Sequence, residues 1–473
     1  MRKIKYIWIF SIATSGCFWG FYYSHTISAN SFWLDQFKLI EYSNEILEGN
    51  FRLVGMRTSR LNWNFPMIHY ILTPLIAVTK NVYVLYISTA ITYVLGVISL
   101  SYLLFKYRPY SEFIIFMSLS LTHVWSLFYS SFMWPPNIIP FFISFFFICF
   151  FHYIKNTSKI LYFHGAAILL NIAFQLHTMS VVLIFGFLLA LLILGKLPRY
   201  RHWFIQVSIQ ILLVSPWIFH HLFVIDWGKE PGYQASLFKD FFSPLQAFLN
   251  YLSGTGLTRE YSPYLNYGTN TFPHETFWRI WLSTGMWFLL LLIIWTLWES
   301  HKLLDTYAIT WKKLYLYLLP FYHEETDINR AYPVAVYCLF LPTFLYLISG
   351  ISMVPHYFQF LTPLVFLMLA ILPGQIRHLT KRKIAWCGIL TVVLIQGCFS
   401  YWRAVEENRS PYLDDVGYTK VVANVVSERC QDNPQIRFVS ERGIKNAGEM
   451  FQYRFVPELE ELTREGTLHC KTL

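Results

Sequence analysis

Residues 31 to 70 read SFWLDQFKLIEYSNEILEGNFRLVGMRTSRLNWNFPMIHY and separate two strongly apolar parts of the chain. Leu34 to Gly49 has helical character, and Gly49 is a natural stop because glycine adopts the left-handed conformation that ends many helices. The stretch is polar enough to lie outside a bilayer, whereas the sequence on both sides is apolar enough to enter one. It therefore predicts the first external loop of a membrane protein with many spans.

One acidic residue of this predicted helix stands apart from the other charges. At roughly 100° per residue, four charged residues share a narrow arc that would face water: Lys38, Glu41, Glu45 and Glu48. Asp35 projects instead toward the side of Leu39, Tyr42 and Ile46. Because a carboxylate on an apolar face is costly to desolvate, Asp35 is either an N-terminal acid favoured by the helix dipole or a catalytic residue. We take it as the candidate catalytic residue.

The amino-acid composition fixes the class of protein. Of the 473 residues, 55% are hydrophobic and only 14% are charged. A soluble domain could not hide that many apolar side chains, so much of the surface must face lipid. The net charge of +10 does not indicate a nucleic-acid partner, because the basic residues lie at the ends of apolar runs, as the positive-inside rule describes.

About eleven apolar runs are interpreted as membrane spans. They are Tyr6–Tyr23, Val82–Phe105, Phe113–Tyr129, Ile138–Tyr153, Leu161–Gln175, Met179–Leu194, Phe204–Ile225, Phe277–Trp298, Val334–Ser352, Phe358–Leu372 and Ile384–Trp402. Residues 65–79 are apolar but short, which indicates a re-entrant or interfacial piece. Basic residues before the first run favour an uncleaved span with a cytoplasmic N-terminus over a cleaved signal peptide. The predicted fold class is an all-α polytopic membrane protein.

The predicted organisation is a transmembrane domain over residues 1–402 and an external soluble tail over 403–473. The transmembrane domain has external loops at 27–81 and 226–276, and Leu237 to Leu252 is expected to form an interfacial helix. The tail has ordinary soluble composition and a strand-like run at residues 435–439, which predicts a small α/β appendage. In an oxidising compartment its two cysteines, Cys430 and Cys470, are expected to pair.

The placement of charge favours chemistry at the outer membrane surface. The first external loop carries four basic residues, Arg52, Arg57, Arg60 and Lys80. They either pair with the glutamates of the loop or hold an anion such as a lipid phosphate. No Asp, Glu, Lys or Arg lies in the middle of a predicted span, where ion-coupled transporters usually place such groups. No zinc-ligand spacing, P-loop or dinucleotide-binding glycine pattern occurs, so no metal or cofactor is predicted.

An acid after the first span, then an E-x-x-x-G-x-x-x-L-x-G-type run, then P-x-x-H-Y-x-L-x-P, resembles the polyprenyl-phosphate-sugar-dependent glycosyltransferases of the GT-C class. The nearest branch is the bacterial relatives of protein O-mannosyltransferases and of the lipid A aminoarabinose transferase. The matching residues are Asp35, Gly49, Leu53, Gly55, Ser59 and Pro66 through Pro74. Further similarities are residues 134–140, 175–177 and 355–357, so the resemblance spans about the first 370 residues.

The resemblance implies transfer of a sugar from an undecaprenyl-phosphate-like carrier to an acceptor hydroxyl on the outer face of the inner (plasma) membrane. The acceptor is a glycan, a lipid or a protein. Asp35 would take the acceptor proton, and cations would stabilise the departing phosphate. The candidate donor-binding residues are Arg57, Arg60, Lys80, His69, Tyr70, His356 and Tyr357. His177 is expected to satisfy a buried backbone group or Gln175.

The chain departs from the pattern of these enzymes in two places. Relatives often carry an Asp-Glu pair after the first span, but here Asp35 is followed by Gln36. Many also carry an acid in the second outer turn, and residues 134–137 have none. Two alternatives remain. The first is an envelope polysaccharide polymerase or ligase, whose reaction centre is expected in arginine-rich large outer loops. The second is a non-enzymatic transporter of lipid-linked glycans, which is disfavoured because the predicted spans carry no charged residue in their middle.

Overall fold

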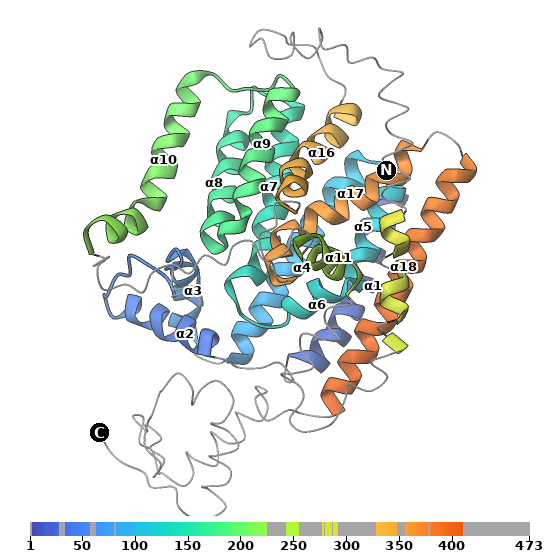
Figure 1. The fold of residues 1–473 in the computed structure, drawn as a ribbon, viewed down its shortest axis with the longest axis horizontal. Coiled ribbons are helices and arrows are strands. Elements are labelled where there is room, and N and C mark those ends of the chain that lie inside the picture. The colour runs from blue at the N-terminus through green and yellow to red at the C-terminus, as the bar shows by residue number, and fades with distance from the viewer. Residues whose placement is uncertain are drawn as a thin grey trace, which may run out of the picture.

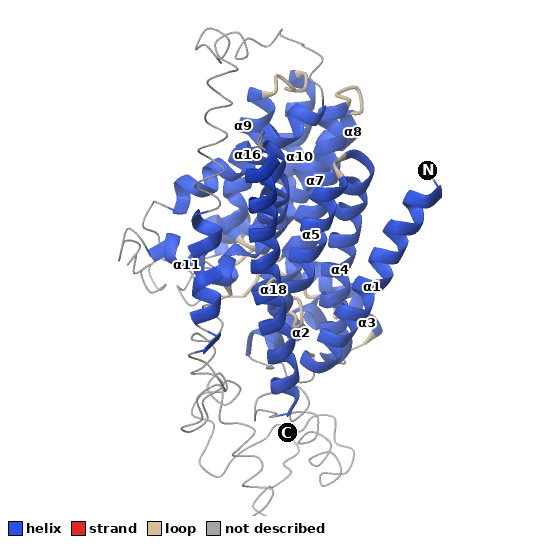
Figure 2. Cartoon of the chain, turned by 90° about the vertical axis from the view of Figure 1, so that its right-hand side faces the viewer, coloured by secondary structure: helices blue, strands red, loops and turns tan. Residues whose placement is uncertain are grey.

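The structure is a computed structural model, and it describes residues 2–27, 34–56, 63–79, 82–224, 243–254, 277–278, 280–285, 287–291, 328–347, 355–376 and 379–409. Every regular element of these residues is helical, and the helices run largely along one axis (Figures 1 and 2). The helices of the first half are α1 (Arg2–Thr26), α2 (Leu34–Leu47), α3 (Met67–Val78), α4 (Val82–Tyr107), α5 (Tyr110–Thr122), α6 (Val124–Tyr129), η1 (Pro135–Ile138), α7 (Ile139–Lys155), α8 (Ile160–Leu176), η2 (Thr178–Ser180) and α9 (Val181–Ile193). Those that follow are α10 (Tyr200–Phe219), η3 (His220–Val224), α11 (Ser243–Ser253), α16 (Ile328–Leu347), η4 (Pro355–Leu361), α17 (Thr362–Gln375) and α18 (Leu379–Arg409).

The protein is a helical membrane protein. Five helical segments of the described chain are long and apolar enough to cross a membrane: Tyr83–Tyr107, Pro135–Lys155, Tyr200–Phe223, Tyr357–Gly374 and Leu379–Val405. The segment around α10 is the clearest case, because only 6% of its most apolar 18-residue stretch is buried inside the protein. Side chains such as Phe204 and Leu212 are 75% and 72% exposed, which water would not tolerate over a whole helix.

The core is a bundle built from helices that are apolar on most sides. α7 packs between α4 and α8, α9 packs against α16, and α5 packs against both α17 and α18. α1 covers α18, while α10 lies at the edge of the bundle against α8 (Figure 1). Large aromatic side chains fill the interior, and among the fully buried ones are Trp125, Tyr86, Phe146 and Phe150. This packing replaces lipid contacts by protein contacts of similar apolar character.

Aromatic contacts mark one end of the bundle, and basic residues mark the other. Tyr401, late in α18, contacts Phe21 and Tyr22, late in α1, at 6.0 Å between ring centroids in each case. Phe65, just before α3, contacts residues late in α8 and α10. We call the end formed by the C-terminal ends of α1, α8, α10 and α18 the loop end. The opposite, basic end carries Lys106, Arg108, Lys155, Lys159, Lys196, Arg199, Arg201, Lys381, Arg382 and Lys383.

Several predicted elements have different bounds in the structure. The predicted span from Phe113 to Tyr129 is two helices, α5 and α6, which meet at His123. The last helix does not stop at Trp402 but continues to Arg409, so residues 403–409, assigned to the tail, are helical. The count of eleven spans stays a prediction, since the structure describes the run from Phe277 to Trp298 only in part. The α/β appendage and its cysteine pair lie outside the described residues.

Candidate functional site

The segment predicted to be the first external loop folds as a compact unit, the loop unit, in which α2 lies on α3. The buried side of α2 is formed by Gln36, Leu39, Ser43 and Ile46. The Ser43 hydroxyl donates to the Leu39 carbonyl at 2.7 Å and to the His69 carbonyl of α3 at 3.3 Å. These contacts fix the rotation of α2, so the position of each residue along it is set. The predicted arc of charges agrees in part, since Glu41 and Glu48 are exposed while Lys38 and Glu45 are half-buried.

Arg52 ties the segment after α2 back onto that helix. Its guanidinium lies 2.5 Å from a Glu45 carboxylate oxygen and 3.4 Å from the centroid of the Tyr42 ring. Its carbonyl accepts a hydrogen bond of 2.8 Å from the Tyr70 hydroxyl. The Arg52 guanidinium therefore contacts both a carboxylate and an aromatic face. The contact with Glu45 agrees with the first of the two predictions for the basic residues of this loop, namely pairing with its glutamates. Tyr70, a candidate ligand for the donor, acts here as a brace between α3 and the loop.

Two glycines shape the same loop. Gly49 follows α2 with φ of 91°, which confirms the predicted helix stop and explains the residue type, since only glycine takes this conformation without strain. The Gly55 N–H donates to the Asn64 carbonyl at 2.8 Å, and the Asn64 N–H donates back to the Met56 carbonyl at 2.9 Å. A Cβ at Gly55 would collide with the Phe65 carbonyl. The glycines of the matched motif thus have structural reasons to be present.

His69 lies inside the unit rather than on its surface. Its side chain is fully buried against α2, with the Tyr42 ring 5.3 Å away between centroids. Neither ring nitrogen forms a hydrogen bond of ordinary geometry within the described part of the chain. Burial and the Arg52 cation lower the pKa of His69 to about 4, against a weak opposing effect of the Leu39 carbonyl. The imidazole is therefore neutral near pH 7, and in this arrangement it does not reach a ligand at the surface.

Asp35 occupies the first turn of α2. The structure describes its backbone position but not its side chain. Because α2 is fixed by Ser43 and Arg52, that first turn is held at the loop end of the bundle. Three candidate cations of the donor site, Arg57, Arg60 and Lys80, lie outside the described residues.

The loop unit is anchored to the C-terminal ends of α8 and α10. The Phe65 ring lies 5.0 Å from Phe174 and 4.8 Å from Trp217 between centroids. The Trp217 indole N–H donates to the Trp63 carbonyl at 3.0 Å. These contacts join residues far apart in the chain and place α3 beside the end of α8 (Figure 1).

A second group of predicted residues lies just beyond α8. Half-buried Tyr357, in η4, contacts the His177 ring at 4.9 Å between centroids. The backbone of His356 is part of the same short helix, while its side chain is not described. Gln175, one of the two expected partners of His177, donates to Asn171 at 2.5 Å. The end of α8 thus contacts the loop unit through Phe174, and His177, which follows α8 directly, contacts Tyr357.

The break at His123 is a feature that sequence reasoning missed. Where α5 stops, three of its carbonyls accept hydrogen bonds from other helices: Ser120 from Tyr93, Leu121 from Tyr401, and Thr122 from Ser400. The His123 side chain itself caps α6 by accepting from the Ser126 N–H. Donors from α4 and α18 therefore replace the hydrogen bonds that a continuous helix would have made.

The C-terminal end of α11 is held at the same break. His123 Nε2 lies 3.0 Å from the Tyr251 carbonyl, and the Trp125 indole donates to the Asn250 carbonyl at 3.2 Å. The Gln396 amide of α18 donates to the Leu252 carbonyl at 2.5 Å. The segment predicted to be the second external loop, 226–276, therefore contains a helix, α11, that is anchored inside the bundle. The prediction of a helix over residues 237–252 is confirmed for its described part, which starts at Ser243.

A buried cation on α18 was also missed. Arg403 is only 4% exposed and stacks on the Phe128 ring of α6 at 4.6 Å. A sequence signal for it exists, because Gln396, Phe399, Ser400 and Arg403 share one helical face at spacings of three and four. All four are buried. Arg403 therefore belongs to the polar interior of the loop end.

Among the described residues, no group of three or more His, Cys, Asp or Glu side chains is arranged to hold a metal ion. The cysteines of the described spans are free, and of these Cys17, Cys387 and Cys398 are exposed. No known protein family, curated protein or solved structure gives a significant match to the chain.

Proposed function

We propose that the protein is a membrane glycosyltransferase that moves a sugar from a polyprenyl-phosphate carrier to an acceptor hydroxyl. The observation that carries the proposal is the fixed position of α2, which holds the first turn with Asp35 at the loop end of the bundle. Two cations lie at the same end, Arg52 on the loop and buried Arg403 on α18. The resemblance of residues 35–74 supplies the class of donor.

The chemistry needs one proton acceptor and at least one cation. The acceptor hydroxyl attacks the anomeric carbon of the donor while its proton passes to the Asp35 carboxylate. The bond from that carbon to the phosphate oxygen breaks, and the polyprenyl phosphate leaves with the bonding electrons. A cation near the phosphate stabilises the charge that develops on this leaving group. In this scheme Tyr357 and His356 contact the donor from the other side of α8, whereas His69 and Tyr70 hold the loop unit together.

Release of polyprenyl phosphate by the purified protein tests the proposal. The protein would be incubated with synthetic polyprenyl-phosphate sugars and cell-envelope acceptors, and the released phosphate would be separated by chromatography. A glycosyltransferase releases one polyprenyl phosphate for each sugar transferred. A transporter of lipid-linked glycans releases none, and that result with every donor and acceptor offered would reject the proposal.

The orientation that the proposal requires follows from the distribution of charge. Ten basic residues lie at the basic end of the bundle, which the positive-inside rule assigns to the cytoplasm. We therefore expect Glu48→Cys, exposed after α2, to react with a membrane-impermeant maleimide in intact cells or spheroplasts. Ser158→Cys, exposed between α7 and α8, should react only after permeabilisation. The parent protein gives the background from its native cysteines, and the reverse labelling pattern would invert the topology.

Replacing the loop cations should weaken donor binding. Arg57→Ala or Arg60→Ala removes a group that can form charge-assisted hydrogen bonds to a phosphate, so the KM for the donor should rise by about tenfold or more. The kcat should fall less, because Asp35 stays in place. Arg201→Ala, an exposed cation at the basic end, is the matched control and should leave KM unchanged. An unchanged KM in both loop variants would remove these arginines from the donor site.

A further inference from the structure

Two lysines from different helices converge on one tyrosine ring at the basic end. The Lys155 ammonium group, at the end of α7, lies 4.1 Å from the centroid of the Tyr107 ring, and the Lys106 ammonium group of α4 lies 5.1 Å from the same centroid. Phe151 and His152 of α7 contact this ring at 5.2 and 6.1 Å between centroids. The two ammonium groups are therefore at most about 9 Å apart, close to the Debye length at physiological ionic strength, so they repel each other.

Within the described residues, no carboxylate compensates these charges. Lys159, just before α8, adds a third ammonium group, and the charges of all three lysines act on His152. The basic end of the described chain contains one acidic side chain, Glu112, and both of its oxygens accept hydrogen bonds from Arg108. We call Lys106, Lys155 and Lys159 the lysine cluster. It is a concentrated positive surface that favours an anion.

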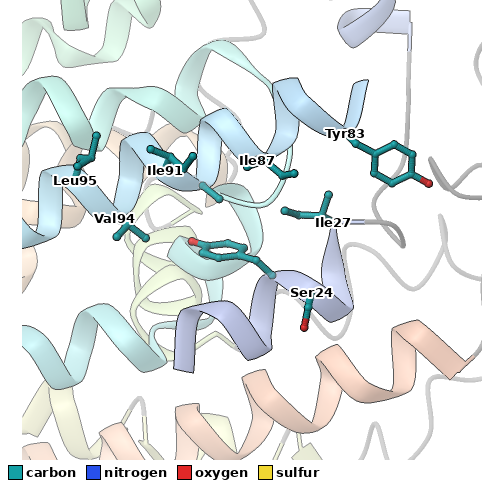
Figure 3. A pocket seen from close by; sticks show the side chains of 9 residues that line it. Ser24, Ile27, Tyr83, Ile87, Ile91, Val94 and Leu95 are labelled. Atoms are coloured by element: carbon teal, nitrogen blue, oxygen red, sulfur yellow. The ribbon is translucent and has the colours of Figure 1, made fainter. Parts of the chain in front are cut away.

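An apolar stripe along α4 leads to the lysine cluster. Ile87, Ile91 and Leu95 lie on the same side of α4, where they line an apolar pocket against α1 (Figure 3). Tyr102 continues this side two turns beyond Leu95, and Lys106 follows one turn later. The four uncharged side chains of the stripe are each between 44% and 51% exposed. The Lys106 ammonium group lies 5.9 Å from the centroid of the Tyr102 ring, so a hydrocarbon chain packed along α4 would bring its polar end to this cation.

We infer that the lysine cluster binds the phosphate of an anionic glycerophospholipid from the membrane leaflet at the basic end. An ammonium group contacts a phosphate oxygen at about 2.7 to 2.9 Å, so one phosphate can bridge Lys106 and Lys155 and cancel their repulsion. The acyl chains lie against the α4 stripe on the side of Tyr102. Basic pockets between transmembrane helices on the cytoplasmic side favour such headgroups. The bound lipid joins α4 to α7 at this end of the bundle.

Two features distinguish this site from the general positive charge of a cytoplasmic face. The positive-inside rule concerns the number of basic residues in the loops and does not require lysines of two helices to share one aromatic ring. A soluble anion would use the ammonium groups but would leave the apolar stripe uncovered. The inference does not depend on the proposed function, because it concerns the end of the bundle opposite to the loop unit.

Lipid binding by the purified protein tests the inference. The delipidated protein would be titrated with phosphatidylglycerol or with phosphatidylcholine of the same acyl chains, and bound lipid would be counted by native mass spectrometry. We expect the wild-type protein to prefer phosphatidylglycerol by about twentyfold, since each lysine near the headgroup contributes about fivefold. Lys106→Gln with Lys155→Gln should remove most of this preference and leave the affinity for phosphatidylcholine unchanged.

The matched control removes the same charge from the same end. Arg199→Gln with Lys383→Gln replaces two exposed cations, one just before α10 and one in α18, and should keep the preference. Lys106→Arg with Lys155→Arg keeps the charge of the site and should also keep it. Each variant would be compared after its elution volume and helical circular dichroism match those of the wild type. An equal loss of preference in the control and in the glutamine variant of the lysine cluster would mean that overall charge attracts the lipid, and would overturn the inference.

Glycerol 3-phosphate distinguishes a lipid from a soluble anion. It carries a phosphate group without acyl chains, so at the same concentration it should displace little phosphatidylglycerol from the wild-type protein. Displacement of the lipid by glycerol 3-phosphate would identify the lysine cluster as a site for soluble phosphates and reject the glycerophospholipid.

Discussion

Replacing Asp35 by asparagine should reduce sugar transfer by about a hundredfold or more, as expected for the loss of a general base. Asparagine keeps the size of the side chain and removes its ability to accept the proton of the acceptor hydroxyl. Transfer would be followed as released polyprenyl phosphate with purified protein at saturating donor. Binding of the donor should persist, because cations rather than this carboxylate hold the phosphate.

The same substitution distinguishes catalysis from a structural role of Asp35. An acid in the first turn of a helix stabilises it by about 0.3 to 1 kcal/mol through the helix dipole. If that were its only role, Asp35→Asn would lower stability slightly and leave the rate per folded molecule unchanged. The packing of α2 makes the test clean, because Ser43 and the Arg52–Glu45 pair hold the helix independently of its first turn.

Two further variants complete this experiment. Glu41→Gln removes an exposed carboxylate from the same helix and should leave the rate near the wild-type value. His69 is a poor substitute base, since it is fully buried and its pKa of about 4 leaves little affinity for a proton. A wild-type rate for purified Asp35→Asn would show that the assignment is wrong. The search for a base would then move to His356, whose short helix lies beyond α8.

The sequence predicted the loop unit better than any other part because its signals are local. The stop at Gly49 depends on the conformational freedom of one residue, and the buried positions of α2 follow from helical periodicity. The short apolar segment before Lys80 is α3, which starts and ends within two residues of the predicted bounds at 65 and 79. What sequence could not supply was the burial of His69, because that depends on how α2 crosses α3.

The missed features all depend on partners that are distant in the chain. Nothing between Thr122 and Val124 forces a helix to stop, and the break at His123 is stable because Tyr93, Ser400 and Tyr401 satisfy the freed carbonyls. Such donors are visible only once α4 and α18 are placed beside α5.

The basic end contains a buried ion pair that was not predicted from the sequence. Arg108 follows an apolar run, where the positive-inside rule predicts a cytoplasmic cation, yet it forms a buried ion pair with Glu112. Its Nε and Nη2 atoms donate to the two carboxylate oxygens of Glu112 at 2.9 and 2.8 Å, and the side chains are only 5% and 3% exposed. The guanidinium also lies 4.9 Å from the centroid of the Tyr332 ring in α16. The pair thus joins the turn between α4 and α5 to the start of α16.

Removing one member of this pair should destabilise the protein severely. Glu112→Leu keeps an apolar side chain of similar size but leaves the Arg108 charge buried without its carboxylate, which typically costs about 3 to 5 kcal/mol. The free energy of unfolding would be measured by reversible denaturation in mixed micelles. Glu45→Leu, which breaks the half-exposed pair with Arg52, is the control and should cost about 1 kcal/mol or less.

The double variant Arg108→Met with Glu112→Leu decides why the single change is costly. Two apolar side chains of similar volume remove both desolvation penalties, so most of the lost stability should return. Recovery would show that the uncompensated Arg108 charge, rather than lost packing, destabilises Glu112→Leu. If the double variant were as unstable as Glu112→Leu, the bidentate pair and its contact with Tyr332 would themselves be what holds the basic end of the bundle together.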